Sequence, residues 1–138
     1  MDIVKTEAEM IAWGEKLGKT LSAPVTIELI GDVGTGKTTL VKGIARALGI
    51  TTPITSPSFT LSKSYHSQKG LTLLSHYDFY RLADPGILAE ELAESIHDPH
   101  TITIVEWAET VKDVLPKGRI KITLGYLDDG SRSVEITQ

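Results

Sequence analysis

The fold of this chain is decided by the stretch Gly31-Asp32-Val33-Gly34-Thr35-Gly36-Lys37-Thr38-Thr39. It fits the Walker A pattern, a glycine and four variable residues followed by glycine, lysine and threonine. Glycines let backbone N–H groups turn inward around a phosphate, and the following helix directs its positive end at the same anion. Lys37 would reach the β and γ phosphates, and the Thr38 hydroxyl suits Mg²⁺. The stretch predicts a nucleotide site made by Gly31, Asp32, Val33, Gly34, Thr35, Gly36, Lys37, Thr38 and Thr39.

The residues on either side of this stretch supply the strand and the helix that a phosphate-binding loop requires. Apolar and polar residues alternate over residues 25–29 and end on Ile30, which predicts a strand. Apolar residues at helical spacing follow from Leu40 to Leu48, and Gly49 suits the C-terminal cap. The order of strand, loop and helix favours a phosphate-binding loop over a chance glycine-rich turn.

The rest of the chain continues the alternation of strands and helices. A capping box of Thr6 and Glu9 begins a helix that we expect to reach Leu21. The patterns predict strands at 60–65, 71–78, 101–106, 120–124 and 133–136, and helices that begin at Asp84-Pro85 and span about 108–114. We therefore expect an α/β fold: one P-loop NTPase-like domain over residues 1–138, with a mixed central β-sheet flanked by helices and a C-terminal β-hairpin.

Composition narrows the possible functions. The chain has 138 residues, and 14 basic against 18 acidic side chains give a net charge of −4, which argues against broad binding to nucleic acids or anionic membranes. The absence of cysteine excludes disulfides, thiolate catalysis and cysteine-ligated metals. No signal peptide and no apolar run long enough to span a membrane is found, so we expect a cytoplasmic protein.

Two acidic residues at predicted strand ends are candidates to hold a metal ion together with Thr38. Glu106 ends the strand that contains Ile102, Ile104 and Val105, and Asp78 ends the strand 71–78. The magnesium ion of a P-loop site usually has a second contact to an acid at the end of a strand. The residues alone leave both candidates open.

Four blocks of residues together resemble the bacterial TsaE (YjeE) family, the small ATPases of tRNA threonylcarbamoyladenosine synthesis. The blocks are Gly31 to Thr39, Ser56-Pro57-Ser58-Phe59-Thr60-Leu61, His76-Tyr77-Asp78-Phe79-Tyr80-Arg81-Leu82 and Val105-Glu106-Trp107. The resemblance covers roughly the whole chain. It implies a Mg²⁺-dependent, weak ATPase that acts with the TsaB–TsaD assembly, which places a threonylcarbamoyl group on adenosine 37 of ANN-decoding tRNAs. It implies contact with tRNA only through that assembly, and we expect a monomer when the chain is isolated.

The same resemblance assigns roles to individual residues. It implies that Glu106 acts on magnesium with Thr38, while Asp78 positions water or metal-bound water, so that Lys37, Asp78 and Glu106 form the catalytic set. It implies that Thr6 and Arg132 flank the adenine. It also implies a switch or partner-contacting set near the γ phosphate, formed by Ser56, Ser58, Thr60, Tyr80, Arg81 and Trp107.

Three other functions share the glycine-rich loop. A small-molecule kinase needs a lid and several cations around the phosphoryl group, whereas this chain has four scattered arginines. A GTPase usually reads guanine with an Asn-Lys-x-Asp motif, and the chain contains no asparagine. A nucleotide-gated binding module without turnover shares every feature of the sequence with the ATPase. Only a measurement of hydrolysis separates the nucleotide-gated binding module from the ATPase.

Overall fold

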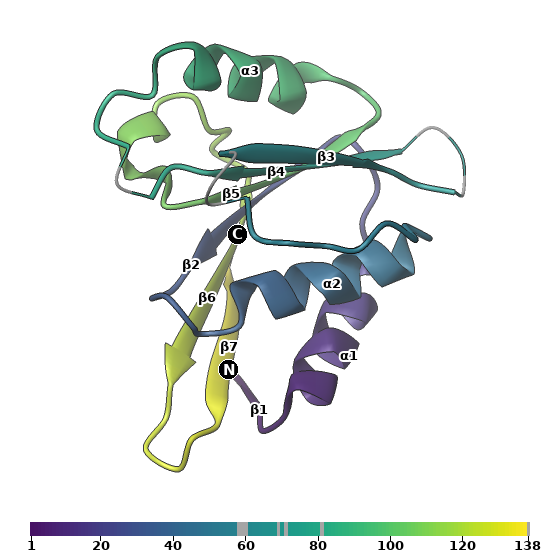
Figure 1. Ribbon diagram of the computed structural model, residues 1–138, viewed down its shortest axis with the longest axis vertical. Helices are drawn as coiled ribbons and strands as arrows, with labels where there is room; N and C mark the ends of the chain where they lie inside the picture. Colours follow the sequence, from purple (N-terminus) through teal and green to yellow (C-terminus); the bar gives the residue numbers. More distant parts are fainter. Residues whose placement is uncertain (58–60, 69, 71, 81, 138) are drawn as a thin grey trace.

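The computed structural model describes residues 1–57, 61–68, 70, 72–80 and 82–137. A sheet of seven strands forms its centre, in the order β1-β7-β6-β2-β5-β4-β3 (Figure 1). The four inner strands β6, β2, β5 and β4 are parallel, whereas β3, β7 and β1 pair antiparallel at the edges. The elements are β1 (Asp2–Val4), α1 (Glu7–Gly18), β2 (Val25–Ile30), α2 (Lys37–Ala47), β3 (Ser62–His66), β4 (Leu73–Asp78), α3 (Gly86–His97), β5 (Thr101–Glu106), the 3₁₀ helix η1 (Ala108–Val111), β6 (Ile120–Tyr126) and β7 (Arg132–Thr137).

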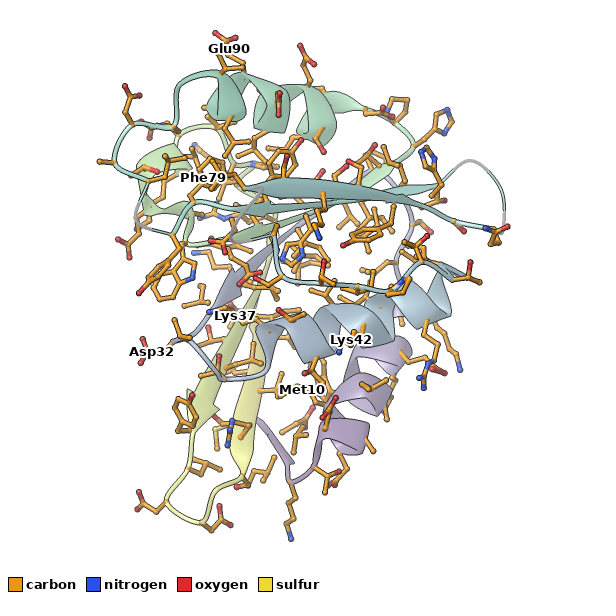
Figure 2. All side chains as sticks on the ribbon, in the orientation of Figure 1. Met10, Asp32, Lys37, Lys42, Phe79 and Glu90 are labelled. Atoms are coloured by element: carbon orange, nitrogen blue, oxygen red, sulfur yellow. The ribbon has the colours of Figure 1, made fainter. Side chains whose placement is uncertain are left out.

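Helices lie on both sides of the sheet, so the domain has three layers. α1 and α2 lie together on one side, and α3 lies on the other (Figure 1). The core between the α1–α2 pair and the sheet includes Ile27, Leu40, Ile44 and Ile104, which are completely buried. A second core includes Leu92 on α3. Glu90 on α3 points away from the sheet (Figure 2). This arrangement confirms the expected α/β fold with a mixed central sheet.

Two glycines allow α1 and α2 to pack closely against each other. A Cβ atom at Gly14 would lie 2.3 Å from the carbonyl oxygen of Leu40, and one at Gly43 would lie 2.1 Å from that of Ile11. Any larger residue would force the helices apart. Glycine lowers the intrinsic helix propensity of α1, but here it permits the contact that fixes α2, the helix that follows the glycine-rich loop.

The arrangement of the inner strands brings their carboxyl ends to one edge of the sheet. β5 lies between β2 and β4, with Glu106 paired in register with Leu29 on one side and with Asp78 on the other. The loop between β2 and α2, residues 31–36, begins at this same edge, and we call it the glycine loop. Ligands of open α/β sheets bind at this kind of position.

The structure corrects several element boundaries. β1 is not evident in the sequence because it has only three residues; it pairs with β7 and so widens the expected C-terminal hairpin of β6 and β7. The segment expected as a helix over 108–114 is a 3₁₀ turn of four residues. α1 ends at Gly18 rather than Leu21, and α3 begins at Gly86, one residue after Pro85. The differences in α1 and α3 lie at helix ends, where local patterns are weakest.

Candidate functional site

A cavity of about 690 Å³ opens between the glycine loop and the ends of β4 and β5. We call it the charged cavity. The residues that line it were all selected from the sequence, and they come from four separate parts of the chain. They include Lys37, Thr38, Ser56, Asp78, Tyr80, Glu106 and Trp107. Val33, Gly34, Gly36 and Thr39 complete its lining. The cavity is therefore formed by the glycine loop on one side and by strand ends on the other.

The glycine loop has a backbone conformation that its glycines make possible. Gly34 and Gly36 have φ angles of +84° and +104°, in the region that disfavours residues with a Cβ atom. The N–H and the hydroxyl group of Thr35 both donate to the carbonyl oxygen of Asp32, at 3.2 and 2.8 Å. α2 begins at Lys37, directly after the loop, so the positive end of its dipole faces the cavity. This geometry suits an anion.

Lys37 is the buried cation of the charged cavity. Its ammonium group donates to the carbonyl oxygens of Gly31 and Asp32, and it lies 3.8 Å from a carboxylate oxygen of Glu106. Figure 2 shows Lys37 where β2 and α2 approach each other. Burial lowers the pKa of Lys37, while Glu106, Asp78 and Asp32 oppose that change by attraction. A phosphate group could replace the carbonyl contacts and stabilise the charge.

Glu106 has a second buried partner that the sequence analysis did not select. The Nε2 atom of His76 is hydrogen-bonded to Oε2 of Glu106, and the imidazole is completely buried. His76 lies on β4 two residues before Asp78, so both side chains are on the same face of that strand. This period of two on a strand is a signal that could have identified His76. The contact joins residues that are thirty positions apart in the sequence, and no local pattern predicts it.

Two aromatic residues form the outer wall of the charged cavity. The ring of Trp107 lies 4.6 Å from the ammonium group of Lys37, at a distance that permits a cation–π contact. The ring of Tyr80 packs against the ring of Trp107, with the two centroids 4.7 Å apart and an angle of 42° between the ring planes. Trp107 has a φ angle of +55°, a strained conformation for a large residue. The tryptophan, immediately after Glu106, thus lies near Lys37 while it also packs against the second core.

A smaller cavity of about 220 Å³ adjoins the charged cavity across the glycine loop. We call it the hairpin cavity, because Gly130 and Arg132 of the C-terminal hairpin line it together with Thr6 and Met10 of the first helix region. Gly34, Gly36 and Thr39 line both cavities. The structure thus brings Thr6 and Arg132 to one site although they lie at opposite ends of the chain.

Tyr126 attaches the C-terminal hairpin to the glycine loop, and the sequence analysis did not select it. Its hydroxyl group donates to the carbonyl oxygen of Val33 at 2.7 Å, and the guanidinium of Arg132 lies 4.4 Å from its ring centre. A Cβ atom at Gly34 would be only 2.6 Å from the tyrosine oxygen. The hairpin therefore restrains the loop directly.

The model of the family described as threonylcarbamoyl adenosine biosynthesis protein TsaE matches residues 4–134. The chain belongs to the TsaE family. It is 43% identical over 127 residues to the tRNA threonylcarbamoyladenosine biosynthesis protein TsaE of Nostoc sp., covering 90% of this chain and 76% of that protein. It is 34% identical to the TsaE protein of Treponema pallidum, with 97% of each chain covered.

A solved structure shows the same fold. The crystal structure of YdiB from Bacillus subtilis matches with a TM-score of 0.79 and 29% sequence identity, covering 96% of this chain and 80% of that one. The expected resemblance to the TsaE family is confirmed by these comparisons. No helix of the described residues is both long and apolar enough to cross a membrane.

The oxygen atoms around the charged cavity fit a magnesium ion in the TsaE-family chain. Thr38, Asp78 and Glu106 line the same cavity, and Mg²⁺ prefers oxygen ligands. Within the described parts of the chain, no group of three or more His, Asp or Glu side chains could enclose a metal ion. A metal ion here would therefore keep water and phosphate oxygens as most of its ligands, as Mg²⁺ usually does.

The remaining selected residues divide into two groups. Asp32 and Val33 are exposed on the glycine loop, and Figure 2 shows Asp32 pointing outward from the molecule. Ser58, Thr60 and Arg81, which the resemblance placed in the switch or partner-contacting set, lie outside the described residues. Of that set, the structure places Ser56, Tyr80 and Trp107 around the charged cavity.

Proposed function

We propose that this TsaE-family chain binds ATP with Mg²⁺ at the glycine loop and hydrolyses it slowly, as an accessory subunit of tRNA threonylcarbamoyladenosine synthesis. The observation that carries the proposal is the convergence of Lys37, Thr38, Asp78 and Glu106 on one cavity at the start of α2. The curated relatives are named for this biosynthesis, which supports the pathway. The modification concerned is the threonylcarbamoyl group on adenosine 37 of ANN-decoding tRNAs.

Each residue of the charged cavity has a distinct part in this proposal. Bound magnesium would neutralise phosphate charge as it develops during hydrolysis. Thr38 and Glu106 hold that ion, while Lys37 leaves the loop carbonyls and pairs with the β and γ phosphates. Asp78, buried at the end of β4, orients the attacking water. Lys37, Asp78 and Glu106 are therefore the proposed catalytic set.

The hairpin cavity would receive the adenine. It adjoins the charged cavity along the glycine loop, so one nucleotide can extend through both. Thr6 and Arg132, which lie near opposite ends of the chain, both line it. Met10, which is buried beneath them, offers an apolar contact to the base.

We also propose that the outer wall of the charged cavity contacts a TsaB–TsaD assembly, and that tRNA is reached only through it. Tyr80 is exposed while its ring packs on Trp107, so a partner could change the position of both. Ser56, Ser58, Thr60 and Arg81 belong to the same proposed set. The net charge of −4 argues against an extensive direct contact with tRNA.

The proposal is tested by measuring ATP binding and phosphate release, first with the purified chain and then with TsaB and TsaD added. We expect Mg²⁺-dependent binding that favours ATP over GTP, slow release of phosphate by the chain alone, and faster release in the complex. Equal affinity for GTP would contradict the proposed base site. Binding without any phosphate release, with or without partners, would instead identify a nucleotide-gated binding module.

A further inference from the structure

From the buried contact between β4 and β5, we infer that His76 is a positioning residue that orients the Glu106 carboxylate towards the metal ion and the glycine loop. The inference rests on the proposed nucleotide function and adds a residue to it. His76 lies outside the charged cavity lining, so it acts through Glu106 rather than on the nucleotide.

The two oxygen atoms of the Glu106 carboxylate have different neighbours. One oxygen, Oε2, is bonded to His76, and the other, Oε1, faces the ammonium group of Lys37 at 3.8 Å. A carboxylate oxygen accepts hydrogen bonds and an imidazole N–H donates them, so this contact holds Oε2 on the side of His76. The imidazole therefore fixes the rotation of the carboxylate and leaves Oε1 available on the side of the glycine loop.

Packing alone does not account for an imidazole at position 76. The side chain of His76 is completely buried, and its Nδ1 atom has no hydrogen-bond partner among the residues that the structure describes. A buried polar atom without a partner destabilises the fold. Leucine or phenylalanine would fill the space without that cost, whereas only a donor can hold Glu106.

His76 and Glu106 are both attached to the central sheet. β4 and β5 are adjacent parallel strands, with His76 in register with Ile104 and Asp78 in register with Glu106. The donor and the carboxylate are thus attached to neighbouring inner strands of the sheet, not to a loop. Residues that orient a metal-binding carboxylate typically change metal affinity 10–100-fold when they are replaced.

The test measures how much Mg²⁺ increases the affinity for a nucleotide. This quantity does not depend on turnover. The probe is the ATP analogue with a methylene group between its β and γ phosphates, and its affinity is measured by calorimetry with and without Mg²⁺. We expect His76→Leu to reduce the Mg²⁺-dependent gain in affinity about tenfold or more, while the affinity without Mg²⁺ stays within about twofold.

Matched variants separate orientation of Glu106 from a general effect on the fold. The amide of His76→Gln can still reach Glu106, so it should keep most of the gain, whereas the shorter His76→Asn should lose it as His76→Leu does. If His76→Leu does not fold, as judged by circular dichroism, the glutamine and asparagine variants decide the matter. In a Glu106→Gln background, His76→Leu should have little further effect on the gain.

Several outcomes would overturn the inference. The first is an unchanged Mg²⁺-dependent gain in affinity in His76→Leu or, if that variant does not fold, in His76→Asn. The second is an equal loss of affinity with and without Mg²⁺. The third is an effect of His76→Leu that is as large in the Glu106→Gln background as in the unaltered chain. A failure of the proposed function is distinguishable from these outcomes, because the unaltered chain would then not bind the analogue at all.

Discussion

The charged cavity contains buried ionic groups from the start of α2 and the ends of β4 and β5, whereas the charged residues that line the hairpin cavity, on the other side of the glycine loop, are exposed or half-buried: Lys5, Glu7 and Arg132. Lys37 and Glu106 are 7% and 4% exposed, so removing the charge of either leaves the buried charge of the other without its partner. Thr6 and Gly130 of the hairpin cavity are exposed, and Arg132 is half-buried. The comparison implies that binding energy and chemistry depend mainly on the charged cavity, while the hairpin cavity selects the base and positions the nucleotide.

The largest effect is expected at Lys37. Lys37→Ala removes the cation that would pair with the β and γ phosphates, and we expect nucleotide affinity to fall about a hundredfold. Lys42→Ala is the matched control, because Lys42 lies on the same helix and is exposed (Figure 2). Calorimetry with ATP and Mg²⁺ measures both variants. Equal binding by Lys37→Ala and the unaltered chain would contradict the assignment of the glycine loop.

The next effect concerns Glu106, and it distinguishes binding from chemistry within the charged cavity. Glu106→Gln keeps the shape of the side chain but removes its charge, so we expect hydrolysis at saturating ATP to fall about a hundredfold and affinity to change less than about tenfold. Glu109→Gln, at an exposed position three residues later, is the control. A collapse of affinity with an unchanged maximal rate would show that Glu106 has a different role.

Sequence reasoning predicted the charged cavity better than the hairpin cavity, and the physical reason is the range of the contacts. The glycine loop, Asp78 and Glu106 are each recognisable locally, because each directly follows or ends a strand with an alternating or apolar pattern. Parallel pairing of those strands then brings their ends together. The contacts of Tyr126 with Val33 and of His76 with Glu106 join distant positions, and nothing in the local pattern indicates them.

In the fold, too, contacts between distant parts of the chain could not be predicted from the local sequence. The strand β1 is absent from the predictions because three residues carry no usable period, and only its pairing with β7 makes it a strand. Glycine, as at Gly14, has a low intrinsic helix propensity. Its close approach to Leu40 on α2 shows why the helix tolerates it.

A smaller effect is expected where the hairpin holds the glycine loop. Tyr126→Phe removes the hydrogen bond to the carbonyl oxygen of Val33 but keeps the ring beneath Arg132, so we expect a loss of about fivefold in nucleotide affinity. Tyr65→Phe, on β3, serves as a control distant from the hairpin. A loss as large as that of Lys37→Ala would show that the two sides of the loop contribute equally, contrary to the comparison.

The smallest effect is electrostatic and concerns the turn of the hairpin. Hydrogen bonds from Ser131 lower the pKa of Asp129 below 3.8. The resulting stabilisation is present above pH 3.8 and is lost as the pH falls through the lowered pKa. Ser131→Ala removes the hydroxyl donor, so the pKa of Asp129 should rise towards 3.8 in an NMR titration, with Asp128 as an internal reference. An unmoved pKa would mean that the backbone N–H of Ser131 alone sets it.

The central claim is that the glycine loop serves tRNA threonylcarbamoyladenosine synthesis. Mass spectrometry of tRNA nucleosides from cells depleted of this protein tests it most directly, with the unaltered chain, Lys37→Ala or Lys42→Ala supplied in turn. The account predicts loss of the modified nucleoside on depletion, recovery with the unaltered chain and with Lys42→Ala, and no recovery with Lys37→Ala. Full recovery with Lys37→Ala, at equal protein levels, would contradict it.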